Sequence, residues 1–364
     1  MREFPNRATN ILNVGNKQIG ADNPIYFIAD IAANHDGDLS RAQRLIELAA
    51  KAGANAVKFQ HFRAKTIVSA QGFKELGGQI AHQSKWNKSV YEVYEEASLP
   101  WSWTEILART ANDNGVDFFT APYDLEAIEH VNPFVPAFKV GSGDITWIES
   151  IEAMAIKGKP IFLATGASML EDVSRAIAAI EKFNTPYCLM QCNTNYSGES
   201  ENSTWANIRV LIKYSELFPN AVLGLSDHTP TNMTTLSAIT LGARAIEKHF
   251  TDDRQRSGPD HYFSLDAGLW KQMVQEASLT LQGLGNGTKV IEQNEMESVV
   301  VQRRALRYLK NKKKGEIIDE KDLIPLRPCP KNGVEPYRKH EYIGQCLEFD
   351  VREDQLVQPG DIKK

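Results

Sequence analysis

The chain has 364 residues, of which 42% are hydrophobic and 24% are charged, and its formal net charge at pH 7 is −5. This composition is ordinary for a globular protein, and the small negative charge argues against binding to nucleic acid or an anionic membrane. No apolar run approaches the roughly 18 residues of a spanning helix, so we expect no membrane segment.

The first residues, MREFPNRATN, lack the apolar core of a secretory signal. The four cysteines, Cys188, Cys192, Cys329 and Cys346, show no CxxC spacing. We therefore expect free thiols in a reducing cytoplasm, with Cys188 and Cys192 buried in the core.

Short apolar runs alternate with segments of helical period along residues 1–285. Strands are predicted at 25–31, 56–60, 117–121, 137–140, 160–164, 186–191, 221–225 and 243–246. Helices are predicted at 39–52 (N-cap Ser40, C-cap Gly53), 103–114, 124–131, 145–156, 168–183, 207–218, 233–241 and 267–284. A polar stretch from 64 to about 101 resembles a loop-and-helix insertion over the mouth of a barrel.

Eight strand–helix units in succession indicate parallel strands and the α/β class. They favour a closed (β/α)8 barrel (TIM barrel), which takes roughly 250 residues, over an open doubly wound sheet. No GxGxxG or P-loop motif is present, which weakens a nucleotide-binding interpretation.

The character of the chain changes after Gly285. We expect a linker over 286–302, with a helix at 292–301, and a small domain over 303–364. Strand-like pieces are predicted there at 305–309, 315–317, 322–325 and 347–351. A core of this size is marginal alone, so we expect the domain to lean on the barrel or on a partner subunit.

Two of the barrel strands end in histidine-containing clusters, Ser226-Asp227-His228-Thr229 and Glu247-Lys248-His249. In parallel α/β folds the reacting groups lie at the carboxyl ends of the strands. Imidazoles at two adjacent strand ends can share a divalent metal of borderline hardness, such as Mn²⁺, Co²⁺ or Zn²⁺. A following turn, 258–261, carries Asp260.

Many other polar residues also fall at predicted strand ends. They are Asp30, Asn34, His35, Lys58, Gln60, Lys139, Ser142, Asp144, Thr165, Asn193, Thr194, Asn195 and Tyr196. Lysines, hydroxyls and glycine-flanked amides suit a phosphate. Each residue also has a structural interpretation: a lysine can be paired within the barrel, and Ser142 can belong to a turn. We assign His61, His82, His130 and His340 to structural roles.

Seven segments together resemble the sialic acid synthases, the N-acetylneuraminate synthase family. They are IADIAANHDGDL, AGANAVKFQ, FKVGSGD, ATGAS, GLSDHT, IEKHFTDDRQRSGPDHYFSLD and KKGEIIDEKDLIPLRP, in the family's order. The resemblance covers nearly the whole chain. It implies a TIM barrel followed by an antifreeze-like (SAF, β-clip) domain, in a domain-swapped homodimer where that domain covers the partner's barrel mouth.

The resemblance also implies an activity, condensation of phosphoenolpyruvate with a hexose such as N-acetylmannosamine. The product is a nine-carbon 2-keto-3-deoxy acid, and phosphate is released. The implied metal is Mn²⁺, with Mg²⁺ or Co²⁺ as alternatives, held by His228 and His249. The implied phosphoenolpyruvate ligands are Lys58, Lys139, Ser142 and Ser226. The implied sugar ligands are Gln60, Tyr196, Asp260 and Arg327 of the partner subunit.

Some motifs depart from the family pattern. Asp30 and Asp144 stand where the family usually has glutamate, and we expect one of them to handle a proton. The strand-six motif is CNTNYSG in place of CT-x-x-YPT, and the lid reads RPCPKNGVEP in place of RPGTG. These changes suggest another acceptor, either a diacetamido sugar of the legionaminate or pseudaminate type or a non-acetylated one. A catalytically silent homologue that binds metal and sugar is a third alternative.

Overall fold

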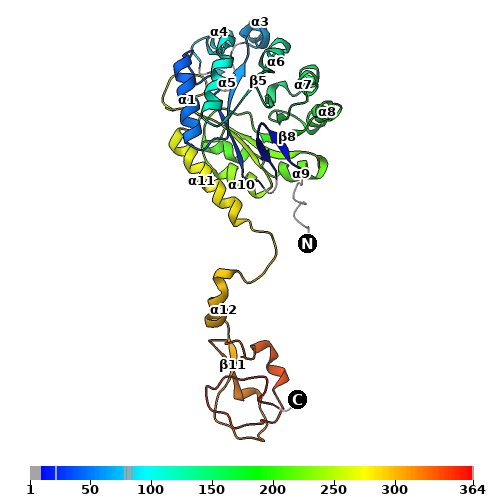
Figure 1. Ribbon diagram of the computed structural model, residues 1–364, viewed down its shortest axis with the longest axis vertical. Helices are drawn as coiled ribbons and strands as arrows, with labels where there is room; N and C mark the ends of the chain where they lie inside the picture. The colour runs from blue at the N-terminus through cyan, green and yellow to red at the C-terminus, as the bar shows by residue number, and fades with distance from the viewer. Residues whose placement is uncertain (1–9, 21–22, 78, 80–82, 85, 363–364) are drawn as a thin grey trace. The chain divides into compact units, whose positions relative to one another are not determined.

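A computed structural model of the chain describes residues 10–20, 23–77, 79, 83–84 and 86–362. The chain divides into two compact units, the barrel unit Met1–Gly285 and the C-terminal unit Asn286–Lys364 (Figure 1). Within the described ranges, no helix combines the length and the apolar character needed to cross a bilayer.

The barrel unit is built on a closed sheet of parallel strands in the order β10-β3-β4-β5-β6-β7-β8-β9. The strands are β3 (Tyr26–Asp30), β4 (Ala56–His61), β5 (Asp117–Pro122), β6 (Phe138–Val140), β7 (Ile161–Ala164), β8 (Tyr187–Cys192), β9 (Val222–Asp227) and β10 (Ala245–His249). The ring closes where β10 pairs with β3, from Ala245 beside Tyr26 to His249 beside Asp30. The predicted (β/α)8 barrel is therefore confirmed.

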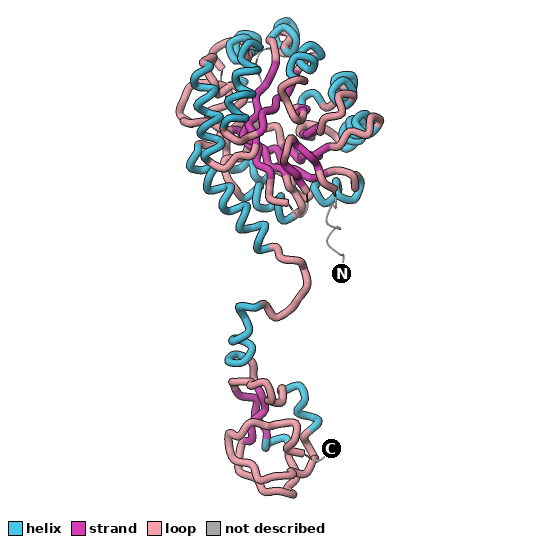
Figure 2. The backbone as a smooth tube through the Cα atoms, viewed as in Figure 1, coloured by secondary structure: helices cyan, strands magenta, loops and turns pink. Residues whose placement is uncertain are grey.

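Helices surround this sheet, as the cyan coils around the magenta strands show in Figure 2. They are α1 (Leu39–Lys51), α5 (Thr104–Asp113), α6 (Leu125–Val131), α7 (Ile148–Ala155), α8 (Leu170–Glu181), α9 (Val210–Leu217), α10 (Met233–Thr240) and α11 (Ala267–Gly283). In α1 the buried residues Ala42, Leu45, Ile46 and Ala49 repeat at helical spacing and form one apolar face. The predicted N-cap Ser40 is wrong, because Asp38 accepts the backbone N–H groups of Ser40 and Arg41.

The insertion between β4 and α5 contains α2 (Ala64–Ile67), α3 (Ala70–Glu75), α4 (Val90–Ala97) and the 3-10 turn η2 (Trp101–Trp103). Asp124, the N-cap residue of α6, ties the start of this insertion to the barrel. The Asp124 carboxylate accepts hydrogen bonds from Arg63 Nη2 at 2.9 Å and from Thr66 Oγ1 at 2.8 Å. His82, which we predicted to be structural, lies outside the described residues.

A hairpin of β1 (Leu12–Val14) and β2 (Lys17–Ile19) precedes the barrel and was not predicted from the sequence. Lys17 Nζ lies 2.9 Å from the carboxylate of Asp117, the first residue of β5. The hairpin therefore contacts the amino end of a barrel strand, opposite to the end where the candidate site lies.

The C-terminal unit contains η5 (Gln293–Glu295), α12 (Met296–Gln302), β11 (Ala305–Tyr308), η6 (Glu320–Asp322), β12 (Leu323–Leu326) and η7 (Pro336–Glu341). β11 and β12 pair antiparallel. The unit has its own core, formed by Leu306, Tyr308, Ile318, Leu323, Val334, Tyr342, Leu347, Val351 and Val357. The strands predicted at 315–317 and 347–351 reduce to isolated bridges, such as Ile317 with Cys346.

Candidate functional site

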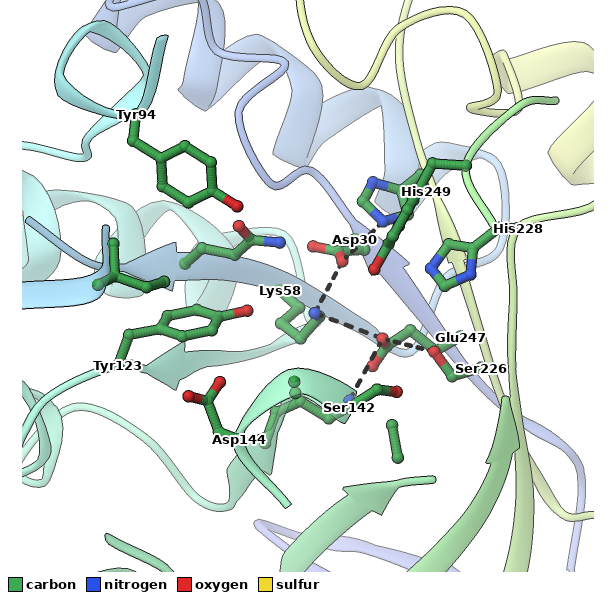
Figure 3. A pocket seen from close by; sticks show the side chains of 17 residues that line it. Asp30, Lys58, Tyr94, Tyr123, Ser142, Asp144, Ser226, His228, Glu247 and His249 are labelled. Carbon is green, nitrogen blue, oxygen red and sulfur yellow. Dashed lines mark hydrogen bonds and ion pairs between the residues drawn. The ribbon is translucent and has the colours of Figure 1, made fainter. Parts of the chain in front are cut away.

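A cavity of about 340 Å³ lies at the carboxyl ends of the barrel strands (Figure 3). It is lined by Asp30, Lys58, Gln60, Ile67, Tyr94, Tyr123, Lys139, Gly141, Ser142, Gly143, Asp144, Ala164, Tyr196, Ser226, His228, Glu247 and His249. Of the residues predicted to bind metal, phosphoenolpyruvate or sugar or to handle a proton, all except Asp260 and Arg327 line it. The roles that the family resemblance implies for them stay predictions.

Strand alternation explains which side chains reach the cavity. Lys58 and Gln60 on β4, like Glu247 and His249 on β10, are two residues apart and share a face. Lys248, between the latter two, points the other way. Its Nζ contacts Asp227 at 2.6 Å and donates to Thr229 O at 2.7 Å. Asp227 and Lys248 therefore form a structural ion pair outside the cavity.

A buried charge network holds the two cavity lysines. Lys58 Nζ lies 2.7 Å from Asp30 Oδ2 and 3.3 Å from Glu247 Oε1 (Figure 3). Lys139 Nζ lies 3.7 Å from the same Glu247 oxygen, which also accepts a hydrogen bond from Ser226 Oγ at 3.2 Å. Glu247 is thus the centre of the network, although the sequence assigned it no role. The sequence held one indication of this position: Glu247 lies two residues before His249 on the same strand, so both side chains face the cavity.

Burial affects the two lysines differently. Burial alone would lower the pKa of Lys58, but Asp30 and Glu247 outweigh it and hold that pKa above its usual value. Burial lowers the pKa of Lys139, and the more distant Glu247 only partly offsets the effect. An anion placed beside Lys139 would favour its charged form. This end of the cavity therefore suits an anionic ligand.

Three buried polar atoms at the cavity find no hydrogen-bond partner among the described residues. They are Asp30 Oδ1, Glu247 Oε2 and His249 Nδ1. A buried polar atom without a partner costs about 1–3 kcal/mol, and such groups cluster where a ligand or ion completes the bonding.

Ser142 begins a short 3-10 turn, η3 (Ser142–Asp144), that follows β6, and the loop after β7 holds its side chain. Its Oγ accepts the backbone N–H of Gly166 at 3.0 Å. A Cβ at Gly166 would lie only 2.6 Å from Thr194 Cγ2 and 2.9 Å from Ser142 Oγ. A side chain at position 166 would therefore displace its neighbours, and the serine hydroxyl is held at the cavity wall.

The two predicted metal ligands are close together, with ring centroids 5.4 Å apart. His228 Nδ1 donates to Asn193 O at 2.8 Å, because a carbonyl can only accept. Burial lowers the pKa of His228, but Cys192 and the Asn193 carbonyl outweigh it and raise that pKa above its usual value, so a metal at Nε2 would have to displace a proton. Burial lowers the pKa of His249 well below its usual value, which keeps this imidazole neutral. Neutral imidazoles are good ligands for divalent metals. The two imidazoles offer two ligands to a divalent metal. Among the described residues, no group of three His, Cys, Asp or Glu side chains is arranged to hold one.

Tyr196 packs against this histidine pair, with its ring centroid 4.3 Å from that of His228. Of the four predicted sugar ligands, Gln60 also lines the cavity, whereas Asp260 and Arg327 do not. Asp260 Oδ2 accepts the backbone N–H of Ala33 at 3.1 Å, and burial raises its pKa to about 6. Arg327 is exposed in the C-terminal unit, where its Nε donates to Gln302 O at 2.6 Å.

Several predicted strand-end residues have structural roles. Asn34 donates to Phe250 O and to Ser264 Oγ, both at 2.9 Å, and so ties the loop after β3 to the end of β10. The Thr165 hydroxyl donates to Met190 O at 3.0 Å. His61, as predicted, is structural: it is buried and bonds Thr120, Thr104 and no cavity group.

Three large side chains that line the cavity, those of Ile67, Tyr94 and Tyr123, were not among the candidate site residues. Ile67 and Tyr94 come from the insertion, and Tyr123 directly follows the last residue of β5. Tyr123 stands at a strand end, and Ile67 and Tyr94 lie in the insertion that the sequence predicted over the barrel mouth, although neither was singled out as a site residue. Asp144, which was predicted, is half-buried, and burial raises its pKa to about 6.

Comparisons with known proteins agree with this geometry. A family model described as the NeuB family matches residues 45–289. The N,N'-diacetyllegionaminic acid synthase of Campylobacter jejuni is 32% identical over 335 residues, which are 91% of this chain and 98% of that protein. The human N-acetylneuraminate-9-phosphate synthase is 28% identical over 340 residues, 93% of each chain.

Among solved structures, the N-acetylneuraminic acid (sialic acid) synthetase of Leptospira borgpetersenii, crystallised with citrate, superposes with a TM-score of 0.70 at 27% identity. The match covers 80% of this chain and 95% of that one. The family match begins within α1 and takes in the helices and strands from β4 to α11, together with most of the cavity residues. The chain therefore belongs to the NeuB family.

Proposed function

We propose that this NeuB-family enzyme condenses phosphoenolpyruvate with an N-acetylmannosamine-type hexose. The product is a nine-carbon 2-keto-3-deoxy sugar acid, and phosphate is released. The observation that carries the proposal is one cavity that places two buried lysines beside two adjacent histidines. The names of the relatives, which are synthases of legionaminic and neuraminic acids, support the same chemistry.

The donor binds at the lysine end of the cavity. Phosphoenolpyruvate carries a phosphate and a carboxylate, and the Lys58 and Lys139 ammonium groups compensate these charges. Ser142 and Ser226 supply hydroxyl donors beside them. Glu247, which contacts Lys58, Lys139 and Ser226, fixes the spacing of the three side chains.

The acceptor aldehyde lies at the histidine end. His228 and His249 would hold a divalent metal there, with Mn²⁺ preferred, and when bound it polarises a carbonyl oxygen as a Lewis acid. Asp30 Oδ2 lies 3.3 Å from His249 Nε2 and 2.7 Å from Lys58 Nζ. Asp30 therefore orients Lys58 on the donor side of the cavity and His249 on the acceptor side.

The reaction needs one proton acceptor. C3 of phosphoenolpyruvate attacks the aldehyde carbon and forms the C–C bond, water adds at C2, and phosphate leaves by cleavage of its C–O bond. The proton released by that water passes to Asp144, and the former aldehyde oxygen takes up one proton and ends as a hydroxyl. The second proton of the water leaves with the phosphate as C2 becomes the keto carbon, so Asp144 returns to its starting state after one turnover. A carboxylate with a pKa of about 6 is suited to accept a proton near neutral pH.

The C-terminal unit is proposed to act as an SAF-type lid in a domain-swapped homodimer. Arg327 is exposed and, in this proposal, reaches the acceptor bound in the barrel of the other subunit. We also place the enzyme in the cytoplasm, where phosphoenolpyruvate is available.

A second acceptor class is a diacetamido hexose. The legionaminic acid relative, at 32% identity, favours it. The departures CNTNYSG and RPCPKNGVEP also lie in segments expected to contact the sugar.

The test is phosphate release from phosphoenolpyruvate with Mn²⁺ and a panel of acceptors. We expect His249→Ala to lose at least about 10²-fold in kcat, and Lys139→Met to raise the KM for phosphoenolpyruvate. His340→Ala, at an exposed histidine of the C-terminal unit, is the matched control. Undiminished turnover in folded His249→Ala would remove the metal role. Tight binding without phosphate release by the wild type would indicate the silent homologue.

A further inference from the structure

We propose that Asn202 is a positioning residue, which clamps the two chain neighbours of Tyr196 and so holds the tyrosine ring at the histidine end of the cavity. Asn202 does not touch the substrates and acts through Tyr196. The inference rests on the proposed function, because it takes Tyr196 to contact the acceptor sugar.

Tyr196 lies in the loop between β8 and α9, which also contains the 3-10 helix η4 (Ser200–Trp205). A side-chain amide closes the base of this loop, because Asn193 Nδ2 donates to Trp205 O at 3.1 Å. The backbone carbonyl of Asn193 accepts the hydrogen bond from His228 Nδ1 at 2.8 Å. The closed base is therefore bonded directly to one of the predicted metal ligands.

Further along the loop, one buried amide bonds the residues on both sides of Tyr196. Asn202 is 8% exposed, and its Nδ2 donates to Asn195 Oδ1 at 3.1 Å and to Ser197 Oγ at 2.7 Å. Asn195 Oδ1 also accepts the backbone N–H of Ser197 at 2.9 Å. The backbone before and after the tyrosine is therefore held by hydrogen bonds that converge on two amide side chains.

The clamped segment places the Tyr196 ring beside the histidines. Its centroid lies 4.3 Å from that of His228 and 5.3 Å from that of Phe263. Burial raises the pKa of Tyr196, so the hydroxyl stays protonated and can donate to a sugar oxygen. The loop has little room to shift, because a Cβ at Gly198 would lie 2.9 Å from the Tyr262 ring. The ring is thus held in place before the acceptor arrives.

The expected benefit of the clamp is preorganisation. Without it, this polar loop would sample other backbone conformations, and binding of the acceptor would have to order it. Part of the binding free energy would be lost in that ordering, and the KM for the acceptor would rise. The proposed donor ligands Lys58 and Lys139 lie on β4 and β6, outside the loop. The KM for phosphoenolpyruvate should therefore stay unchanged.

The direction of the hydrogen bonds supplies the test. Asn202 donates and Asn195 accepts, so the same isosteric change from amide to carboxylate should have opposite effects at the two positions. Asn202→Asp removes the donor and should raise the KM for the acceptor by at least about tenfold, with the KM for phosphoenolpyruvate unchanged. Asn195→Ala should also raise the acceptor KM. Asn195→Asp should restore it, because a carboxylate accepts both hydrogen bonds.

Steady-state phosphate release with Mn²⁺ gives both KM values. The acceptor is N-acetylmannosamine, or a diacetamido hexose if the wild type turns over only that sugar. Glu201→Ala, at the exposed residue next to Asn202, is the control and should keep the wild-type KM values. Thermal unfolding shows whether each variant is folded at the assay temperature.

An Asn202→Asp enzyme with the wild-type acceptor KM would overturn the inference and leave phosphoenolpyruvate condensation standing. Equal increases in the two KM values would also overturn it, because they would indicate general damage to the barrel mouth. If Asn202→Asp does not fold, the changes at exposed Asn195 decide, and an Asn195→Asp enzyme no better than Asn195→Ala would refute the clamp. Failure of the wild type to release phosphate with any acceptor would overturn the proposed function and this inference with it.

Discussion

Asp144 is predicted to set the acid side of the pH profile. Burial raises its pKa to about 6, and Lys139 offsets only part of that effect. A base with this pKa is ionised to about 90% at pH 7 and about 10% at pH 5, so kcat/KM should fall roughly tenfold between them. Asp144→Asn should lower kcat by about 10²–10⁴-fold and abolish this acid dependence.

The same substitution should not weaken the fold. The pKa of Asp144 rises from 3.8 to about 6 on folding, so the native protein binds more protons than the unfolded chain in this window. Stability is therefore lost as pH rises through the window, by at most about 3 kcal/mol at pH 7. Asparagine cannot ionise, so Asp144→Asn should be as stable as the wild type at pH 7 or more stable.

Phosphate release measured from pH 5 to 8 checks the predicted acid dependence, and thermal unfolding at pH 7 checks the predicted stability of Asp144→Asn. Glu149→Gln, at an exposed carboxylate in the first turn of α7, is the matched control. An Asp144→Asn enzyme that keeps the wild-type acid limb would refute the assignment of the base. If Asp144→Asn loses both activity and stability at pH 7, the carboxylate supports the fold.

Three further predictions concern other parts of the chain. Asp322→Asn removes the carboxylate that pairs with buried Lys312, so the C-terminal unit should lose about 3–5 kcal/mol in chemical denaturation, and an unchanged midpoint would contradict this. Gly166→Ala should cost about 1–3 kcal/mol through overcrowding and raise the KM for phosphoenolpyruvate; wild-type kinetics and melting would refute the packing argument. Mixing Arg327→Ala with His249→Ala subunits should restore about a quarter of wild-type activity if Arg327 acts in the partner's site, and none if it acts in its own.

The barrel was predictable because each strand is a short apolar run with polar residues at its carboxyl end. The same pattern placed Lys58 and Gln60 on one face and predicted that His228 and His249 meet. Alternation along β10 also places Glu247 on the cavity face and Lys248 on the opposite face. The same pattern could therefore have predicted that Glu247 lines the cavity.

Other features depend on packing between distant segments. The hairpin of β1 and β2 has too few residues for a periodic signal, and Ile67 and Tyr94 reach the cavity only because the insertion is anchored to Asp124. Asp260 bonds the loop after β3 rather than lining the cavity, an outcome that turn chemistry alone does not specify. Position in the sequence therefore predicted the strand ends well and the loops poorly.

The central claim is that the enzyme joins all three carbons of phosphoenolpyruvate to an amino-hexose. Its most direct test is incubation of uniformly ¹³C-labelled phosphoenolpyruvate with Mn²⁺ and an N-acetylated hexose, followed by mass spectrometry of the products. We predict a nine-carbon keto acid that carries three labelled carbons, formed in equal amount to the phosphate released. Phosphate release with the label recovered only as pyruvate would contradict the claim, because it would indicate simple hydrolysis.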